Sequence, residues 1–204
     1  MGGRGASIGG RSKGGLLLPS KGGKSERIDT SNWGFQVKVK NDFEKYFGSE
    51  KVEHAFILDK DGNIKGGFKG SKHSVGVDPT LLKAGDTLTH NHPSSYGGTF
   101  SPADVAGLTN NKLAEIRAVA KEGTYSLKAT KTANHEAFNR ALASDIKKIR
   151  EQATVNASKV KRESYIKKSD YDKASRKAYV DTLSSWYKKN ASKYGFKYTS
   201  PKNS

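Results

Sequence analysis

The sequence predicts an α/β domain, with a small mixed β-sheet and flanking helices, followed by a basic C-terminal helical extension. Three observations predict it: apolar residues concentrate between about residues 52 and 127, strand-like runs alternate there with helix signals, and a lysine-rich helical pattern follows. We therefore expect a flexible Gly-rich basic tail at 1–35, the α/β domain at 36–131 and a Lys- and Tyr-rich helical extension at 132–204.

The tail is predicted from its composition. Residues 1 to about 30 alternate Gly-Gly pairs with Arg, Lys and Ser, and such a stretch buries too little apolar surface to offset the entropy of ordering it. Its opening residues, MGGRGAS, resemble the start of many phage-encoded structural or morphogenesis proteins of Gram-positive hosts. This resemblance implies a phage origin.

A short helix and a β-hairpin are the first elements expected in the domain. The helix is expected over 41–47, and an apolar run of strand length follows over 53–58. The dipeptide Asp61-Gly62 is typical of a tight turn, so residues 64–68 are expected to return as the second strand.

The central part of the domain is expected to hold a strand that leads into a helix. A helical stretch over 79–83 with Gly85 as its stop precedes a strand over 86–93, which ends at a proline. After a glycine-containing loop, Ser101-Pro102 predicts a helix start, because serine is a favoured N-cap and proline is favoured at the first helical position.

A second hairpin and the extension complete the predicted elements. The runs 116–120 and 124–129 are joined by Glu122-Gly123, which is typical of a turn. After Thr132 the pattern is helical to about Lys193, with aromatic residues among the lysines. Packing against the domain and stacking on nucleic-acid bases are both open for these aromatics, with packing preferred. They are Tyr165, Tyr171, Tyr179, Trp186 and Tyr187.

The formal net charge of +17 is concentrated in the flanks, since residues 132–204 carry +10 and residues 1–35 carry +4. Cationic flanks attract polyanions, so nucleic acid is a candidate partner of both, with a solvated basic surface as the alternative.

The chain has no cysteine, so a metal would have to be held by His and carboxylates. No apolar run approaches the roughly 20 residues that span a bilayer, so we expect a cytoplasmic protein with no membrane partner.

His90, His92 and Asp104 are candidate metal ligands. Residues two apart on a strand leave the same face, so the two imidazoles could converge on one ion, although His-x-His alone is a common pattern. Asp104 lies three residues after Ser101, at a spacing that shares a helix face and could complete a three-ligand zinc site. Helix capping by Ser101 and Asp104 explains the same two residues equally well.

The order of these parts resembles a known family. A glutamate heads an apolar strand, and the run from His90-Asn91-His92-Pro93 to Ser101-Pro102-Ala103-Asp104 follows. This run resembles the metal motif of the JAB/MPN (JAMM) zinc metallopeptidases, whose fold is cytidine-deaminase-like, and is most similar to RadC-type bacterial and phage members. The resemblance covers residues 36–131. Eight residues separate His92 from Ser101, one more than is usual in the family.

The resemblance implies a peptidase or isopeptidase that hydrolyses an amide bond of a protein or peptide with a metal-activated water. His90, His92 and Asp104 would bind Zn²⁺, Ser101 would stabilise the oxyanion, and Glu53 would be the general base, with Glu50 as the alternative. Two imidazoles and a carboxylate also suit iron or manganese. The location implied is the bacterial host cytoplasm or the virion.

A second hypothesis is a nucleic-acid-associated or virion structural protein that uses a RadC-type JAB fold as a scaffold. A metal nuclease is a further alternative, although the tripeptide His-Asn-His is not the HNH nuclease motif. His54 and His73 could join a metal site, but solvated histidines are the more ordinary interpretation. Nucleotide binding is unsupported, because no Gly-x-x-x-x-Gly-Lys-Ser/Thr spacing occurs.

Overall fold

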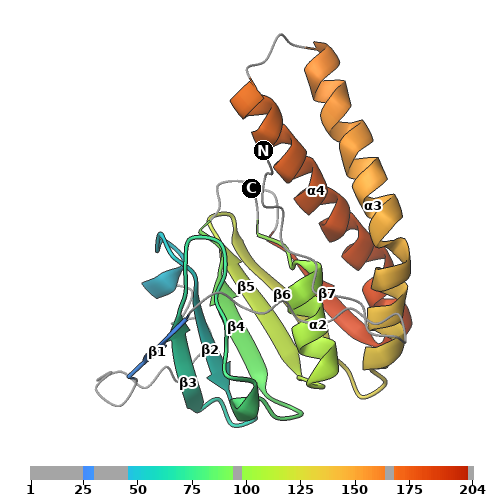
Figure 1. The fold of residues 1–204 in the computed structure, drawn as a ribbon. Helices are drawn as coiled ribbons and strands as arrows, with labels where there is room; N and C mark the ends of the chain where they lie inside the picture. Colours follow the sequence, from blue (N-terminus) through green and yellow to red (C-terminus); the bar gives the residue numbers. More distant parts are fainter. Residues whose placement is uncertain (1–24, 30–45, 94–97, 164–167, 202–204) are drawn as a thin grey trace.

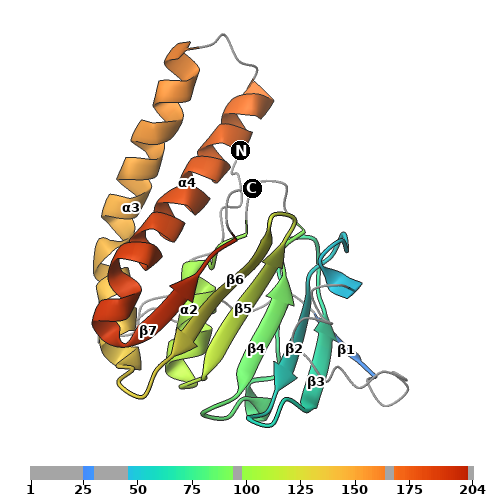
Figure 2. The same cartoon turned by 180° about the vertical axis from the view of Figure 1, so that it is seen from behind.

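A seven-stranded open β-sheet lies at the centre of the fold, and the helices pack on one of its faces (Figures 1 and 2). The computed structural model describes residues 25–29, 46–93, 98–163 and 168–201. The strands are ordered β1-β3-β2-β4-β5-β6-β7 across the sheet. Their bounds are Glu26–Ile28 (β1), His54–Leu58 (β2), Ile64–Lys69 (β3), Thr87–Asn91 (β4), Glu115–Ala120 (β5), Gly123–Ala129 (β6) and Phe196–Thr199 (β7).

The sheet is mixed because it contains one parallel crossover. β4 and β5 run parallel and are joined through helix α2 (Pro102–Asn110), whereas the other neighbouring strands are antiparallel. Such a crossover brings the carboxyl end of the first strand close to the amino end of the helix, where α/β folds commonly bind ligands. The end of β4 and the start of α2 carry the predicted metal ligands.

Helices α3 (His135–Glu163) and α4 (Lys168–Asn190) form a hairpin that packs beside α2 and extends past the sheet (Figure 1). Asn134 precedes α3, and its Oδ1 accepts a hydrogen bond from the Ala137 amide at 3.0 Å. Buried apolar residues then recur every three or four positions, which places them on one face of the helix. They are Phe138, Leu142, Ile146, Ile149, Ala153 and Ala157.

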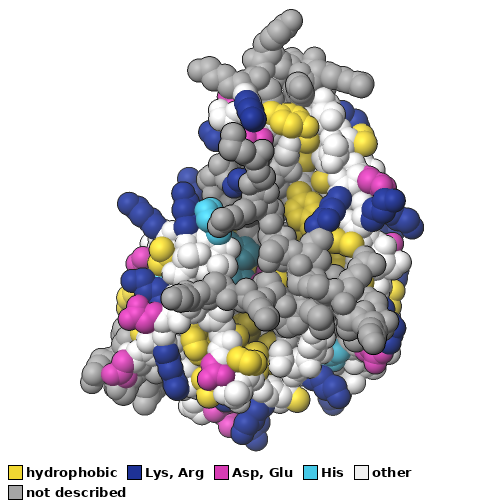
Figure 3. Space-filling view, viewed as in Figure 1, with side chains coloured by type: hydrophobic (Ala, Val, Ile, Leu, Met, Phe, Trp, Pro, Cys, Tyr) yellow, Lys and Arg dark blue, Asp and Glu magenta, His cyan; other side chains and the backbone are white. Residues whose placement is uncertain are grey.

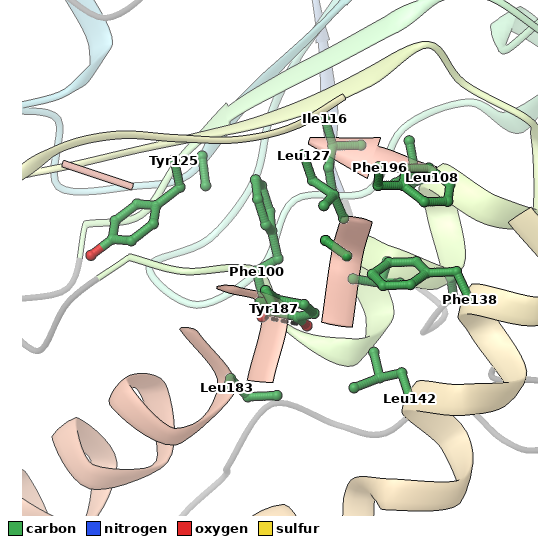
Figure 4. Packing of buried hydrophobic residues seen from close by; sticks show 14 of the residues in the cluster. Phe100, Leu108, Ile116, Tyr125, Leu127, Phe138, Leu142, Leu183, Tyr187 and Phe196 are labelled. Carbon is green, nitrogen blue, oxygen red and sulfur yellow. Dashed lines mark hydrogen bonds between the residues drawn. The ribbon is translucent and has the colours of Figure 1, made fainter. Parts of the chain in front are cut away.

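The extension shares the main hydrophobic core with the sheet. Phe138 of α3 stacks on Phe196 of β7 with ring centroids 4.7 Å apart, and Tyr187 of α4 is fully buried beside them (Figure 4). Ile116 and Leu127, from β5 and β6, belong to the same cluster. Folding of residues 132–204 and of the sheet is therefore coupled through common buried surface.

The predicted mixed α/β architecture, both predicted hairpins and the predicted helix start are confirmed. β2 and β3 pair antiparallel around a turn in which Gly62 has φ +88°. β5 and β6 pair through a turn at Gly123, with φ +125°, a conformation that favours glycine. Ser101 is the N-cap of α2, and Pro102 is its first residue.

Two strands lie within the segments expected to be a tail and a helical extension. Of the tail expected over 1–35, the structure describes residues 25–29, and these contain β1, which pairs with β3. The extension expected to be helical contains β7, which pairs with β6. Both strands are short, so their hydrogen-bonding partners, rather than an alternating local pattern, determine that they form.

Two predicted helical stretches differ in extent or lie partly outside the described residues. The stretch expected over 79–83 is the shorter 3₁₀ helix η1 (Pro79–Leu81), which Asp78 caps. Gly85 follows it with φ +89°, as expected for a stop. Of the helix expected over 41–47, residues 41–45 lie outside the described part, and residues 46 and 47 are helical.

Packing is confirmed as the role of two of the extension's aromatic residues. Tyr187 is fully buried, and the indole Nε1 of Trp186 donates to Asp145 Oδ2 on α3 at 3.0 Å. Tyr171 and Tyr179 are half-buried, and Tyr165 lies outside the described residues. Among the described helices, none combines the length and apolar character needed to cross a membrane.

The shared core predicts a large cost for truncating Phe138. Phe138→Ala is expected to lower the free energy of unfolding by about 3–5 kcal/mol, because the phenyl ring is fully buried between α4 and β7. Val155→Ala on the same helix, where the side chain is 51 % exposed, is the control and should change it by less than about 0.5 kcal/mol. Urea denaturation measures both. Equal effects of the two substitutions would contradict a core shared by extension and sheet.

Candidate metal centre

His90, His92 and Asp104 converge at the junction of β4 and α2. His90 lies in β4, and His92 follows its last residue but remains extended, because its amide donates to the Val119 carbonyl of β5 at 2.7 Å. The two imidazoles therefore leave the same face, as their spacing predicts. Asp104 lies in the first turn of α2.

The nitrogen and oxygen atoms of these three side chains lie close together. The Nε2 atoms of His90 and His92 are 2.9 Å apart. The Asp104 carboxylate places Oδ1 3.6 Å from His90 Nε2 and Oδ2 4.0 Å from His92 Nε2. The exposed fraction rises from 5 % for the His90 side chain to 16 % for His92 and 24 % for Asp104, so the cluster opens to solvent on the Asp104 side.

Asp104 both caps its helix and faces the histidines, so the two explanations of this residue hold together. The Ser101 amide donates to Asp104 Oδ2 at 2.7 Å, and the Asp104 amide donates to Ser101 Oγ at 3.3 Å. This reciprocal capping box fixes the carboxylate. The cap restrains Oδ2, while Oδ1 is the carboxylate oxygen nearer to His90.

The tautomers of the two imidazoles follow from their partners. Nδ1 of His92 lies 3.0 Å from the Gly98 carbonyl, and a carbonyl only accepts, so Nδ1 carries the hydrogen and the neutral ring has a lone pair at Nε2. The hydrogen between the two Nε2 atoms therefore belongs to His90. Thus His92 already presents a lone pair to the cluster, and His90 would release a hydrogen on binding a cation.

The donor set fits a zinc ion. Zn–N bonds of about 2.0–2.1 Å in a tetrahedral site place two ligand atoms about 3.3 Å apart. The distances of 2.9, 3.6 and 4.0 Å lie on both sides of that value, so shifts of less than about 1 Å would bring the three atoms into place. The contact from His92 to the Gly98 carbonyl is the outer hydrogen bond that zinc-binding histidines usually make.

Electrostatic coupling supports one shared site. Burial lowers the pKa of His90, but the nearby negative charges of Asp104 and Glu53 outweigh burial, so the His90 pKa is raised. Burial and the neighbouring His90 charge lower the His92 pKa to about 4. Burial would raise the pKa of Asp104, but the two histidines hold it well below its ordinary value. These shifts favour the protonated form of His90 beside an ionised Asp104 carboxylate.

Glu53 immediately precedes β2 and is electrostatically coupled to the same site. Burial raises the pKa of the Glu53 carboxyl to about 7, against the opposing attraction of His90, and the Asp104 charge raises it further. Its backbone is held on the β3 side, where its amide donates to the Ser71 carbonyl and its carbonyl accepts from the Gly70 amide, each at 2.8 Å. Glu50 is exposed, and its charge acts on His54.

The other histidines lie apart from the cluster. His54 packs its ring on Phe47 with centroids 4.9 Å apart, and its pKa is lowered by burial. His73 is exposed, and His135 Nε2 lies 3.2 Å from the Leu113 carbonyl. In the part of the chain that the structure describes, His90, His92 and Asp104 form the group of three His, Cys, Asp or Glu residues with converging ligand atoms.

Sequence reasoning missed two residues that position the site, Asn91 and Gly98. Asn91 is fully buried between the two histidines in sequence, and its amide bonds the start of β2. Gly98 provides the carbonyl for His92, and a Cβ at this position would lie 2.2 Å from the Ala120 Cβ. In the sequence, Gly97-Gly98 indicated only a loop, because the close approach of Gly98 to Ala120 of β5 arises only when the chain folds.

Comparison of the chain with protein-family models, with curated proteins and with solved structures gave no significant match. The functional assignment therefore depends on the motif and on the geometry of these side chains.

The tight packing at Gly98 predicts a role in metal binding. Gly98→Ala is expected to weaken zinc binding by about tenfold, because the added methyl group collides with Ala120 and displaces the carbonyl that orients His92. Gly107→Ala in α2 is the matched control, since a Cβ there meets nothing within 4 Å. Competition with a chromophoric chelator measures both affinities. Restoration of binding by the added substitution Ala120→Gly would support the collision, and an unchanged affinity of Gly98→Ala would refute it.

Proposed function

We propose that this protein is a zinc-dependent peptidase or isopeptidase of the JAB/MPN (JAMM) type, similar to RadC-type members. The observation that carries the proposal is the convergence of three metal-ligand side chains where the end of β4 meets the start of α2. Two imidazoles and a carboxylate form a three-ligand set, and the carboxyl group of Glu53 is electrostatically coupled to two of them. Catalytic zinc sites have three protein ligands and leave one position open for water or substrate.

In this proposal each residue has a distinct role. His90, His92 and Asp104 would hold the ion, which when bound would supply Lewis acidity towards an amide carbonyl and towards a water molecule. Glu53 would accept a proton from the attacking water at its carboxylate and donate it to the leaving amine. A carboxyl group whose pKa is raised to about 7 suits proton transfer in both directions near neutral pH.

Ser101 suits the stabilisation of the developing oxyanion. Its Oγ accepts the Asp104 amide hydrogen in the capping box, and this bond does not use the hydroxyl's own hydrogen. That hydrogen would donate to the carbonyl oxygen of the substrate as negative charge develops there. The N-terminus of α2, with its positive end of the helix dipole, lies at the same position and would act in the same direction.

Zinc is the metal proposed because the set has two nitrogen ligands and one oxygen ligand and is buried on the His90 side. Iron and manganese accept the same ligand types, so metal analysis decides between them.

The proposed substrate is an amide bond of a protein or peptide. The opening residues are the basis for proposing a phage origin, with a place in the host cytoplasm or the virion.

The charge distribution on the described extension gives less support to nucleic-acid binding as the main function. Lys and Arg side chains are scattered around the face seen in Figure 3, with Asp and Glu among them. On α3 and α4, five cationic side chains lie within 3.9 Å of acidic partners on the same helix. A scaffold role also does not explain why three metal-ligand side chains converge.

Metal content is the first test. Purified protein is expected to contain about one zinc ion per chain, lost in His92→Ala and in Asp104→Asn. Asp104→Asn keeps an oxygen that can accept the Ser101 amide, so the helix cap can persist while the charge is removed. His73→Ala, at an exposed histidine, is the control and should keep the metal. Mass spectrometry measures the metal, and its retention in both ligand variants would reject this site.

The general base is tested separately. Assayed with zinc in excess, Glu53→Gln is expected to keep the fold but to lower kcat on a peptide selected from a fluorogenic library by about 10²–10⁴, since an amide cannot accept the proton. Glu50→Gln is the matched control and should leave kcat unchanged, because Glu50 is exposed and does not act on the cluster. The opposite result, with Glu50→Gln inactive and Glu53→Gln active, would exchange the two assignments.

A further inference from the structure

Asn91 is the last residue of β4 and is fully buried. Side chains alternate along a strand, so the position between His90 and His92 directs Asn91 away from the face that carries the two imidazoles. Asn91 is therefore not part of the metal-ligand set. A buried amide group needs hydrogen-bonding partners, and the partners of Asn91 lie on the neighbouring strand.

The Asn91 amide bonds the two peptide groups on either side of Glu53. Its Oδ1 accepts the His54 amide hydrogen at 2.6 Å, and its Nδ2 donates to the Val52 carbonyl at 3.0 Å. One donor and one acceptor are what a backbone peptide group offers to a neighbouring strand. The Asn91 side chain thus takes the place of β4 backbone at this point.

The backbone of β4 does not supply these hydrogen bonds itself. The register between β2 and β4 extends as far as the pair Ala55–His90. The His92 amide donates instead to Val119 of β5, and Pro93 has no amide hydrogen. The start of β2 therefore depends on the Asn91 side chain for its attachment to β4.

Glu53 is held on both sides as a result. In an antiparallel ladder, successive residues bond to opposite neighbours. The amide and carbonyl of Glu53 bond Ser71 and Gly70 on the β3 side. The Val52 carbonyl and the His54 amide, on either side of Glu53, bond the Asn91 side chain on the β4 side. Glu53 and Ala55 share a sheet face, and Ala55 lies opposite His90, so this attachment points the carboxyl group towards the metal cluster.

We propose that Asn91 is a positioning residue for Glu53: its amide holds the backbone on both sides of that residue and keeps the carboxylate at the metal site. The inference rests on the proposed function, because it assigns a part in the same site. Aspartate could not replace Asn91, since a carboxylate has no hydrogen for the Val52 carbonyl and would be a buried charge.

A double-mutant cycle on zinc affinity tests this proposal without a substrate. A carboxylate beside the ion strengthens zinc binding through its charge, so Glu53→Gln should weaken it. Asn91→Ala is expected to weaken zinc binding by about tenfold in the parent protein, because the carboxylate is no longer held in place. In the Glu53→Gln background the same change should alter the affinity by less than about twofold. Chelator competition at one pH measures all four proteins.

A matched control separates positioning from loss of a buried amide. Asn139 of α3 is also fully buried, and its Nδ2 donates to Thr109 Oγ1 at 2.7 Å, away from the cluster. Asn139→Ala should leave zinc affinity unchanged. Urea denaturation shows whether each variant folds, and Asn91→Ser, which can satisfy one of the two peptide groups, replaces Asn91→Ala if the alanine variant does not fold.

The outcomes distinguish this inference from the proposed function. An equal loss of affinity in both backgrounds, or no loss in the parent, would overturn the role of Asn91. A parent protein that shows the expected coupling but cleaves no amide would refute hydrolysis and leave the positioning role intact. A parent that binds no zinc, or binds it equally after His92→Ala, would overturn both.

Discussion

The burial of polar groups where β4 meets α2 is the constraint on which the rest of the site depends. An unpaired polar group in such a place costs about 1–3 kcal/mol, so a partner from the surrounding structure stabilises it. His92 takes the Gly98 carbonyl, Asp104 takes the Ser101 amide, and Asn91 takes two peptide groups of β2. These partners restrict the side chains to few arrangements, and in the observed arrangement three metal-ligand side chains converge.

The C-terminal extension takes part in this arrangement. Between Gly98 and Ser101, the loop is bonded by aromatic hydroxyl groups from the far end of the chain. The Tyr198 hydroxyl lies 2.7 Å from Thr99 Oγ1, and the Tyr187 hydroxyl donates to the Phe100 carbonyl at 3.1 Å. Ser184 of α4 lies 2.9 Å from the same Tyr198 hydroxyl. The loop that orients His92 and begins α2 is thus positioned by residues about 85 to 100 positions later in sequence.

Part of the candidate site could be predicted from local sequence. The spacing of His90 and His92 determines that they share a face, and Ser101-Pro102 determines where the helix begins, because both follow from backbone geometry over a few residues. The combination of the two histidines with Asp104 in one metal site, and the choice of Glu53 as the base, came from the order of motifs, which resembles that of a known family. Gly98 and Asn91 carried no local signal, since their partners lie on other strands.

The sequence by itself determined the hairpins, the helix start at Ser101 and the common face of the two histidines, since turn residues, capping residues and strand periodicity act over short distances. The tertiary structure alone decided that β1 and β7 join the sheet and that the extension shares its core. These features depend on hydrogen bonds and buried contacts between distant residues, and a local pattern cannot specify which distant partner a residue will contact.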